Sequence, residues 1–253
     1  MRHLCHATAL SIAAFAATFA HADTTLVAVA ANFAGAAEAI SIEFTIKTGH
    51  VALITTGSTG KLYAQIIEGA PFDVLLSADA KTPDLLEADG HAVKGAGFAY
   101  AIGSLTMYSR DPDRIGTDPK AALSDPALRF VAIANPDLAP YGTAAREVLQ
   151  GLRVWDGLQG RIVQGQNIGQ VFGLVQSGAA EIGFVATSAL DAPGSQIGGS
   201  RWEVPDDLFA PLVQKAALLQ NGADNPAAAA FLIFLADPGA RAILQRHGYR
   251  VLQ

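Results

Sequence analysis

The chain has 253 residues, of which 51% are hydrophobic and 16% charged, and it contains 25 glycines and 12 prolines. This composition is typical of a globular protein with one or two domains, and it excludes a disordered, collagen-like or coiled-coil chain. The formal net charge is −6 at pH 7, and no run of Lys or Arg occurs. A surface for the nucleic-acid backbone is therefore not expected.

The first 22 residues have the pattern of a cleaved secretory signal. Arg2 precedes the apolar run ALSIAAFAATFA, and Ala20-His21-Ala22 forms an A-x-A cleavage site before Asp23. The run is shorter than the roughly 20 residues that a membrane span requires, which favours cleavage over an uncleaved anchor. The single cysteine, Cys5, lies in this segment, so the mature chain is expected to have no disulfide and no thiol chemistry.

After the signal, short apolar runs alternate with segments of helical spacing. The first series predicts strands at 26–31, 51–55 and 73–78, followed by helices at 33–47, 62–68 and 82–88. The second predicts strands at 129–135, 161–165 and 182–186, with helices at 143–152 and 168–176 between them. Extended passages at 98–109 and 211–219 and helices at 225–235 and 238–247 complete the chain. This alternation is typical of parallel sheets with crossover helices.

The predicted fold class is therefore α/β with two lobes. Each lobe is expected to hold a mostly parallel sheet flanked by helices, and the two extended passages are expected to cross between the lobes as a hinge. Residues 23–103 together with 210–253 are assigned to lobe 1, and residues 104–209 to lobe 2.

Four predicted strand-to-helix junctions carry small, amide or hydroxyl residues. They are ANF at 31–33, GSTG at 57–60, APYG at 139–142 and QNIG at 166–169. Ligands of α/β sheets bind at such junctions, where helix N-termini present unpaired N–H groups to anions. Any one junction could be an ordinary helix cap, and Tyr141 alone a packed aromatic. The four together indicate an anion site without Lys or Arg.

Catalytic motifs fit poorly. A phosphate loop would need glycine at position 55 and Ser or Thr at 62, where the chain has Thr55 and Leu62. A nucleophile elbow around Ser58 would need glycine at 56, where Thr56 stands. The histidines beyond the signal are far apart in sequence, so a histidine metal site or a Ser-His-Asp triad is not expected. The sequence thus favours a binding protein without metal or cofactor over an enzyme.

The motifs TLVAVAANF, GSTGKLYAQIIEGAPFDVLLSAD, AIANPDLAPYGTAAREVL, GQNIGQ and IGFVATSAL occur in this order along the chain. In them the chain resembles the periplasmic molybdate-binding proteins of molybdate ABC importers. The resemblance implies a periplasmic binding protein fold of type II. It also implies a protein that holds molybdate or tungstate between its lobes with neutral donors and delivers the anion to a membrane permease. A monomer is expected because the mature chain has no cysteine and no long heptad pattern.

The resemblance also implies which residues bind the anion. Asn32 would donate from the first junction, Ser58 with Thr59 from the second, Tyr141 through its hydroxyl and Ile168 through its backbone N–H. Which of Ser58 and Thr59 is the main donor stays open, although the spacing from Asn32 favours Thr59. The chain departs from some relatives at Ala31, where they have a hydroxyl residue, and at Ala186, where others have a tyrosine.

Two other functions remain as alternatives. A receptor for sulfate, phosphate or a small organic acid would share the fold, but a protonated phosphate favours a carboxylate acceptor and an organic acid an arginine. Neither group is evident at the four junctions. A secreted enzyme on the same scaffold is the less favoured alternative, because no nucleophile and base are paired in any motif.

Overall fold

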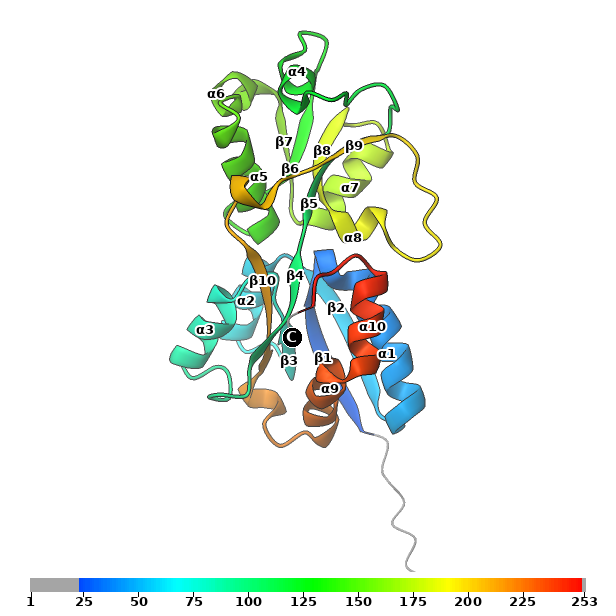
Figure 1. Ribbon diagram of the computed structural model, residues 1–253. Helices are drawn as coiled ribbons and strands as arrows, with labels where there is room; N and C mark the ends of the chain where they lie inside the picture. The colour runs from blue at the N-terminus through cyan, green and yellow to red at the C-terminus, as the bar shows by residue number, and fades with distance from the viewer. Residues whose placement is uncertain (1–22, 252–253) are drawn as a thin grey trace, which may run out of the picture.

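Two five-stranded sheets, each covered by helices, form two lobes that meet end to end (Figure 1). The computed structural model describes residues 23–251. The first sheet has the order β2-β1-β3-β10-β4 and the second the order β7-β6-β8-β5-β9. The predicted α/β, two-lobed fold class is confirmed. The signal predicted at 1–22 lies outside the described residues.

The two sheets share one pairing pattern. In the first, β1 pairs in parallel with β2 and β3, whereas β10 runs antiparallel to β3 and β4. In the second, β6 pairs in parallel with β7 and β8, whereas β5 runs antiparallel to β8 and β9. The strands of the first sheet are β1 (Thr24–Ala30), β2 (Val51–Gly57), β3 (Val74–Leu76), β4 (Phe98–Gly103) and β10 (Leu212–Leu218). Those of the second are β5 (Leu105–Ser109), β6 (Val131–Ala134), β7 (Ile162–Gly165), β8 (Ile182–Ala186) and β9 (Ser200–Glu203).

The helices follow the strands in the crossover order that the sequence predicts. Those beside the first sheet are η1 (Ala31–Phe33), α1 (Ala34–Thr48), α2 (Thr59–Ile67), α3 (Lys81–Ala88), η4 (Gln220–Gly222), α9 (Pro226–Ala236) and α10 (Pro238–Arg246). Those beside the second are α4 (Pro119–Ser124), α5 (Pro140–Gly151), α6 (Trp155–Leu158), η2 (Gln159–Arg161), α7 (Ile168–Gln176), α8 (Thr187–Leu190) and η3 (Asp206–Leu208).

The core of the first lobe has two layers because side chains of a strand alternate between the faces of its sheet. Val27 and Val29 of β1 are fully buried in the layer that contains Phe33 and Phe231, whereas Ala28 between them faces the layer of Leu62. Helices α1, α9 and α10 cover one face of this sheet, and α2 and α3 cover the other. The second lobe has a separate apolar core, which Ala30 and Ala78 of the first lobe adjoin.

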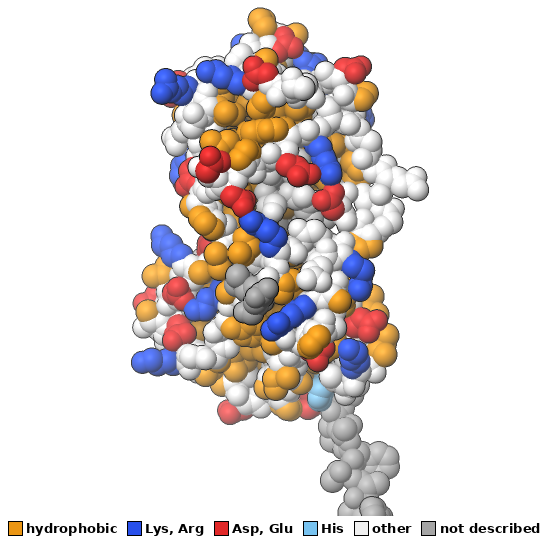
Figure 2. All heavy atoms as spheres, in the orientation of Figure 1, with side chains coloured by type: hydrophobic (Ala, Val, Ile, Leu, Met, Phe, Trp, Pro, Cys, Tyr) orange, Lys and Arg blue, Asp and Glu red, His pale blue; other side chains and the backbone are white. Residues whose placement is uncertain are grey.

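The chain passes between the lobes twice. The strand β4 ends at Gly103 and β5 begins at Leu105, and the second passage connects β9 to β10 (Figure 1). Our proposed lobe limits, 23–103 with 210–253 and 104–209, place the strands of one sheet in each lobe. Acidic and basic side chains are interspersed over both lobes in the face that Figure 2 shows.

Within the described residues, no single helix is long and apolar enough to cross a membrane. Helices α9 and α10 meet the length and composition requirement only jointly, and they are bent by 62° where they join. Phe231 and Leu235 of α9 are buried in the core of the first lobe.

A glycine allows the start of α5 to lie directly against the end of β6. A Cβ atom at Gly142 would lie 2.2 Å from the carbonyl oxygen of Ala134 and 2.7 Å from its carbonyl carbon. Both atoms belong to the backbone, so a change of side-chain rotamer cannot relieve the clash. The position of this helix start therefore depends on the absence of a side chain.

We expect Gly142→Ala to lower the free energy of unfolding by about 1 to 3 kcal/mol, as overpacking in well-packed interiors does. The matched control is Gly157→Ala in α6, where a Cβ would meet nothing within 4 Å. Urea unfolding of both variants measures the difference. Equal stability of the two variants would contradict the close approach of α5 to β6.

Candidate functional site

A small cavity lies between the lobes, at the carboxyl ends of the parallel strands. Its volume is about 10 Å³, and its lining residues are Ala30, Ala31, Asn32, Gly57, Ser58, Thr59, Ala78, Ala139, Pro140, Tyr141, Asn167 and Ile168. The structure thus brings together all five residues that the sequence singles out, from all four predicted junctions. None of these twelve lining residues carries a charged side chain.

Four helix starts surround this cavity. The helix η1 follows β1, α2 begins at Thr59, α5 begins at Pro140 and α7 begins at Ile168. The first N–H groups of a helix have no partner within it and carry the positive end of the helix dipole. These helix starts favour an anion without a basic residue in the wall, although Pro140 itself has no N–H to offer, and Lys61, the basic residue nearest in sequence, is exposed.

Ser58 stands before the first residue of α2 but does not cap the helix. Its side chain makes no capping hydrogen bond, and its Oγ is buried without a hydrogen-bond partner among the described residues. An unpaired buried polar group costs about 1 to 3 kcal/mol, so this hydroxyl is placed for a partner inside the cavity. Thr59 differs, because its Oγ1 accepts a hydrogen bond from the backbone N–H of Ala78 at 3.2 Å.

The side-chain amide of Asn32 is engaged within the protein. Its Nδ2 donates to Gln214 Oε1 at 3.0 Å and to the hydroxyl of Tyr249 at 3.2 Å. As the second residue of η1, Asn32 also has a backbone N–H without a partner inside that helix. The group that Asn32 can offer to the cavity is therefore this N–H.

Tyr141 lines the cavity from the second position of α5. The residue is 1% exposed, and its hydroxyl accepts a long hydrogen bond of 3.4 Å from Gln214 Nε2. Burial raises the pKa of Tyr141 well above its ordinary value, and nearby Tyr249 raises it further. The hydroxyl therefore keeps its proton at neutral pH and can donate it.

The start of α7 supplies the wall from the second lobe. Asn167 caps this helix, because its Oδ1 accepts from the N–H of Gln170 at 3.0 Å. The N–H of Ile168, the first residue of the helix, is not used by this cap. The ordinary capping interpretation thus holds for Asn167, while Ile168 remains available to a ligand.

Direct hydrogen bonds between the lobes hold the cavity closed. The N–H of Gly60 in α2 donates to the carbonyl oxygen of Leu138 at 2.8 Å. On the other side, Ser188 Oγ of α8 donates to the carbonyl oxygen of Asn32 at 3.0 Å and accepts from the Tyr249 hydroxyl at 3.1 Å. These bonds join the two lobes on both sides of the cavity.

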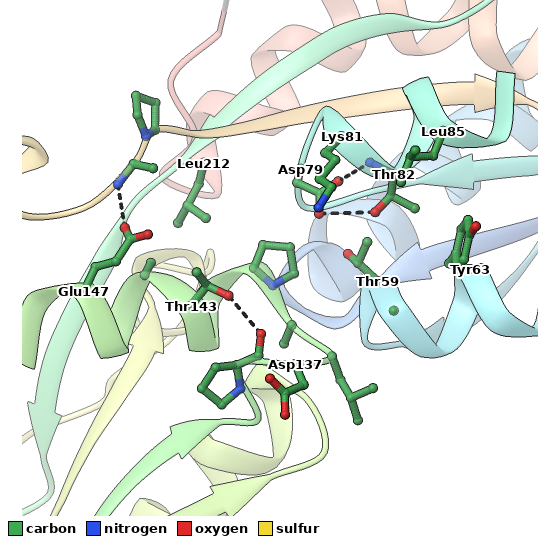
Figure 3. A pocket seen from close by; sticks show the side chains of 18 residues that line it. Thr59, Tyr63, Asp79, Lys81, Thr82, Leu85, Asp137, Thr143, Glu147 and Leu212 are labelled. Carbon is green, nitrogen blue, oxygen red and sulfur yellow. Dashed lines mark hydrogen bonds between the residues drawn. The ribbon is translucent and has the colours of Figure 1, made fainter. Parts of the chain in front are cut away.

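A larger and more open groove lies beside the cavity and shares Thr59, Ala139 and Pro140 with it (Figure 3). Two of its charged residues, Asp79 and Glu147, accept hydrogen bonds that order the fold. Asp79 accepts from the backbone N–H of Thr82 at 2.8 Å, and Glu147 accepts from that of Ala210 at 2.8 Å. Within residues 23–251, no group of three or more His, Cys, Asp or Glu side chains could hold a metal ion.

Sequence reasoning missed the residues behind the cavity, namely Gln214, Tyr100 and Tyr249. Gln214 is fully buried in β10 and bonded to Asn32, Tyr100 and Tyr141. The sequence does indicate that Gln214 is buried. In the run PLVQKAALL it lies two residues from each of the buried positions 212 and 216, on the same face of the strand. A polar residue at a core-facing position of a strand predicts a buried hydrogen-bond partner.

The fold, the cavity and its neutral lining can be compared with known proteins. Residues 25–250 match the family model described as "Bacterial extracellular solute-binding protein". The chain belongs to this family. It is accordingly a solute-binding protein and not an enzyme.

Individual relatives agree with this assignment. The chain is 44% identical to the molybdate-binding protein ModA of Rhodobacter capsulatus, over 96% of this chain and 94% of that protein. It is 42% identical to the protein of the same name from Azotobacter vinelandii, over 91% of each chain. The solved structure of the periplasmic molybdate-binding protein of Azotobacter vinelandii matches with a TM-score of 0.87 at 38% identity, covering 90% of this chain and all of that one. The resemblance identified in the sequence is confirmed.

The buried tyrosines behind the cavity should make stability fall above pH 10. Burial raises the pKa of Tyr249 to about 12, against about 10 in the unfolded chain. Between these pH values the unfolded chain has lost a proton that the folded protein retains, so rising pH favours unfolding. The stabilisation is complete below pH 10, and Tyr249 alone should lose about 1.4 kcal/mol of it at pH 11.

Urea unfolding of the parent and of Tyr249→Phe at pH 8 and pH 11 measures this effect. The hydrogen bonds that the substitution removes are lost at both pH values, so only the difference between them reports the ionisation. We expect the parent to lose more stability than the variant on going to pH 11. The same loss in both proteins would show that Tyr249 is not the group responsible.

Proposed function

We propose that this protein captures molybdate, and tungstate equally well, in the cavity between its lobes and delivers it to the membrane permease of an ABC importer. The observation that carries the proposal is a small, neutral cavity between the lobes at which four helix starts meet. Such a site is suited to binding a dehydrated anion. The relatives named for molybdate binding at 44% and 42% identity support the choice of molybdate.

The proposed donors are the hydroxyls of Ser58 and Tyr141, Thr59, and the backbone N–H groups of Asn32 and Ile168. Each hydrogen bond to a charged group contributes about 1.5 to 3 kcal/mol, and each helix dipole about 0.3 to 1 kcal/mol. Several such contributions together can bind a dianion tightly without a counter-charge. The unpartnered Oγ of Ser58 makes Ser58 a candidate side-chain donor of the second junction, and Thr59, whose Oγ1 accepts from the N–H of Ala78, keeps its own proton to donate as well.

Size is the proposed basis of selectivity. Molybdate, tungstate and sulfate are all tetrahedral dianions, so the donors alone do not separate them. Sulfate is smaller and would leave some dehydrated N–H or O–H groups unpaired, at about 1 to 3 kcal/mol each. A phosphate that keeps its proton needs an acceptor, and the lining of the cavity includes no carboxylate. Both anions are therefore weaker candidates.

Binding is proposed to draw the open form into the closed one. A ligand that contacts both lobes stabilises the closed form, which the permease then recognises. Residues 1–22 are proposed to direct export to the periplasm and to be removed there, leaving a monomer that begins at Asp23. The mass of the exported protein tests the cleavage site.

Tyr141→Phe should weaken molybdate binding about 10- to 100-fold, since one hydroxyl donor to a dianion contributes about 1.5 to 3 kcal/mol. The matched control is Tyr108→Phe, because the Tyr108 hydroxyl donates to the carbonyl oxygen of Gly198 at 2.9 Å and lies outside the cavity lining. Calorimetry with molybdate measures both affinities. If the two variants bind like the parent, Tyr141 is only a packed wall of the cavity.

The anion preference follows from the size argument. We expect tungstate and molybdate to bind within about tenfold of each other, and sulfate at least a hundredfold more weakly, which corresponds to about 2.7 kcal/mol. Competition calorimetry of sulfate and phosphate against molybdate measures the order. Displacement of molybdate by sulfate at comparable concentrations would replace the proposal with a general receptor for tetrahedral anions.

A further inference from the structure

Gln214 is the buried side chain that connects the polar groups behind the cavity. It lies on β10, soon after the chain returns to the first lobe, and it is 0% exposed. Its amide reaches Asn32 and Tyr100 of the first lobe and Tyr141 of the second. Gln214 does not line the cavity itself, so any effect on a bound anion would act through a neighbour.

The partners of this amide fix which way it faces. Gln214 Oε1 accepts from Asn32 Nδ2 at 3.0 Å, and it lies 3.0 Å from the Tyr100 hydroxyl, whose single proton is shared between this oxygen and the carbonyl oxygen of Ser77 at 3.2 Å. An amide nitrogen carries only donors, so the reverse orientation would set Nε2 against the two N–H donors of Asn32. The nitrogen is therefore held toward the Tyr141 hydroxyl, at 3.4 Å.

This orientation determines what the Tyr141 hydroxyl can do. A hydroxyl has one proton, and here its oxygen accepts from Gln214, so the proton is left for another acceptor. The Gln214 oxygen already faces two donors and does not compete for that proton. Tyr141 lines the cavity, so a group inside it is an acceptor that this proton can reach, whereas the Asn32 amide nitrogen near the hydroxyl is itself a donor.

We propose that Gln214 is a positioning residue for anion binding: it holds the Tyr141 hydroxyl with its proton directed into the cavity. The proposal rests on the proposed function, because it assumes that the cavity holds an oxyanion. Its effect is to have the hydroxyl arranged as a donor before the anion arrives, so that binding requires no rearrangement of the tyrosine.

The backbone around Gln214 fits this role. The register between β10 and β4 shifts at Gln214, which pairs with Ala101 while Lys215 pairs with Ala99, so Tyr100 is the extra residue of a bulge. Bulges redirect side chains next to functional sites. A Cβ atom at Gly103 would lie 2.1 Å from the Tyr141 hydroxyl oxygen and 2.7 Å from Gln214 Nε2, so only glycine leaves room for the pair.

A double-mutant cycle on molybdate affinity tests the proposal. Gln214→Met keeps the length of the side chain and removes both hydrogen-bonding atoms. We expect it to weaken molybdate binding about tenfold in the parent and less than about twofold in the Tyr141→Phe background, where no hydroxyl remains to be oriented. Thr106→Val is the matched control. It removes the buried hydrogen bond between the hydroxyls of Thr106 and Thr187, which are 2.8 Å apart, and neither residue lines the cavity.

A purely structural role for Gln214 would weaken binding equally in both backgrounds, and that result would overturn the proposal. An unchanged affinity of Gln214→Met in the parent would overturn it as well. Thr106→Val should lower the free energy of unfolding without changing the affinity. A tenfold loss of affinity in that control too would assign the effect of Gln214→Met to general destabilisation and would likewise count against the proposal.

A ligand-free measurement separates this proposal from the proposed function. The chain has five tyrosines, so labelling their Cζ atoms with ¹³C gives few signals, and Tyr141→Phe identifies the one from Tyr141. We expect Gln214→Met to shift this signal and Thr106→Val to leave it in place. A Tyr141 signal that does not respond to Gln214→Met contradicts the positioning role, whereas a parent that fails to bind molybdate contradicts the proposed function alone.

Discussion

The structure depends on the unpaired N–H groups at helix starts and on where the fold places them. Each lobe directs two of its helix starts toward the other lobe, and closure brings all four to one small cavity. Open to water, these groups would be hydrated. Once enclosed, they need an acceptor, because a buried donor without one is costly. Both the neutral wall and the contact between the lobes therefore serve to enclose N–H donors for which a bound anion is the acceptor.

The polar cluster behind the cavity connects this requirement to the hinge. Gln214 lies on β10 and Gly103 ends β4, so the two strands that adjoin the crossings both reach the Tyr141 hydroxyl. Tyr249 meets Asn32 and Ser188, which belong to different lobes. Closure of the lobes thus completes hydrogen bonds on both sides of the cavity wall. In this arrangement, the geometry of the donors is set by the same contacts that hold the lobes together.

Much of this could be predicted from the sequence, since apolar runs and helix signals are local. The strand at 182–186 and the helix at 168–176 were predicted with the bounds that the structure shows for β8 and α7. Helix α2 begins at Thr59 and α5 at Pro140, each three residues before the predicted start, because the polar and proline residues of a first turn break the apolar pattern. The elements α6, α8 and β9 are not predicted, because their sequences WDGL, TSAL and SRWE mix polar and apolar residues without a recognisable pattern.

The site was predictable to the extent that it lies at chain junctions. Asn32, Ser58, Thr59, Tyr141 and Ile168 all line the cavity because helix starts after parallel strands meet at one edge of each sheet. The sequence did not indicate that the Asn32 amide bonds to Gln214 and Tyr249, residues 182 and 217 positions away. Partners at such separations follow from the fold, and no local pattern contains them.

The central claim is that neutral donors, and no basic side chain, hold the anion. Calorimetric affinity for molybdate at low and at high sodium chloride concentration tests it most directly, because screening by salt weakens attraction between solvent-accessible charges and acts far less on a buried site. The account predicts an affinity that changes by less than about threefold between about 20 mM and about 500 mM salt. A steep fall, by tenfold or more, would show that Lys or Arg carries the binding and would contradict it.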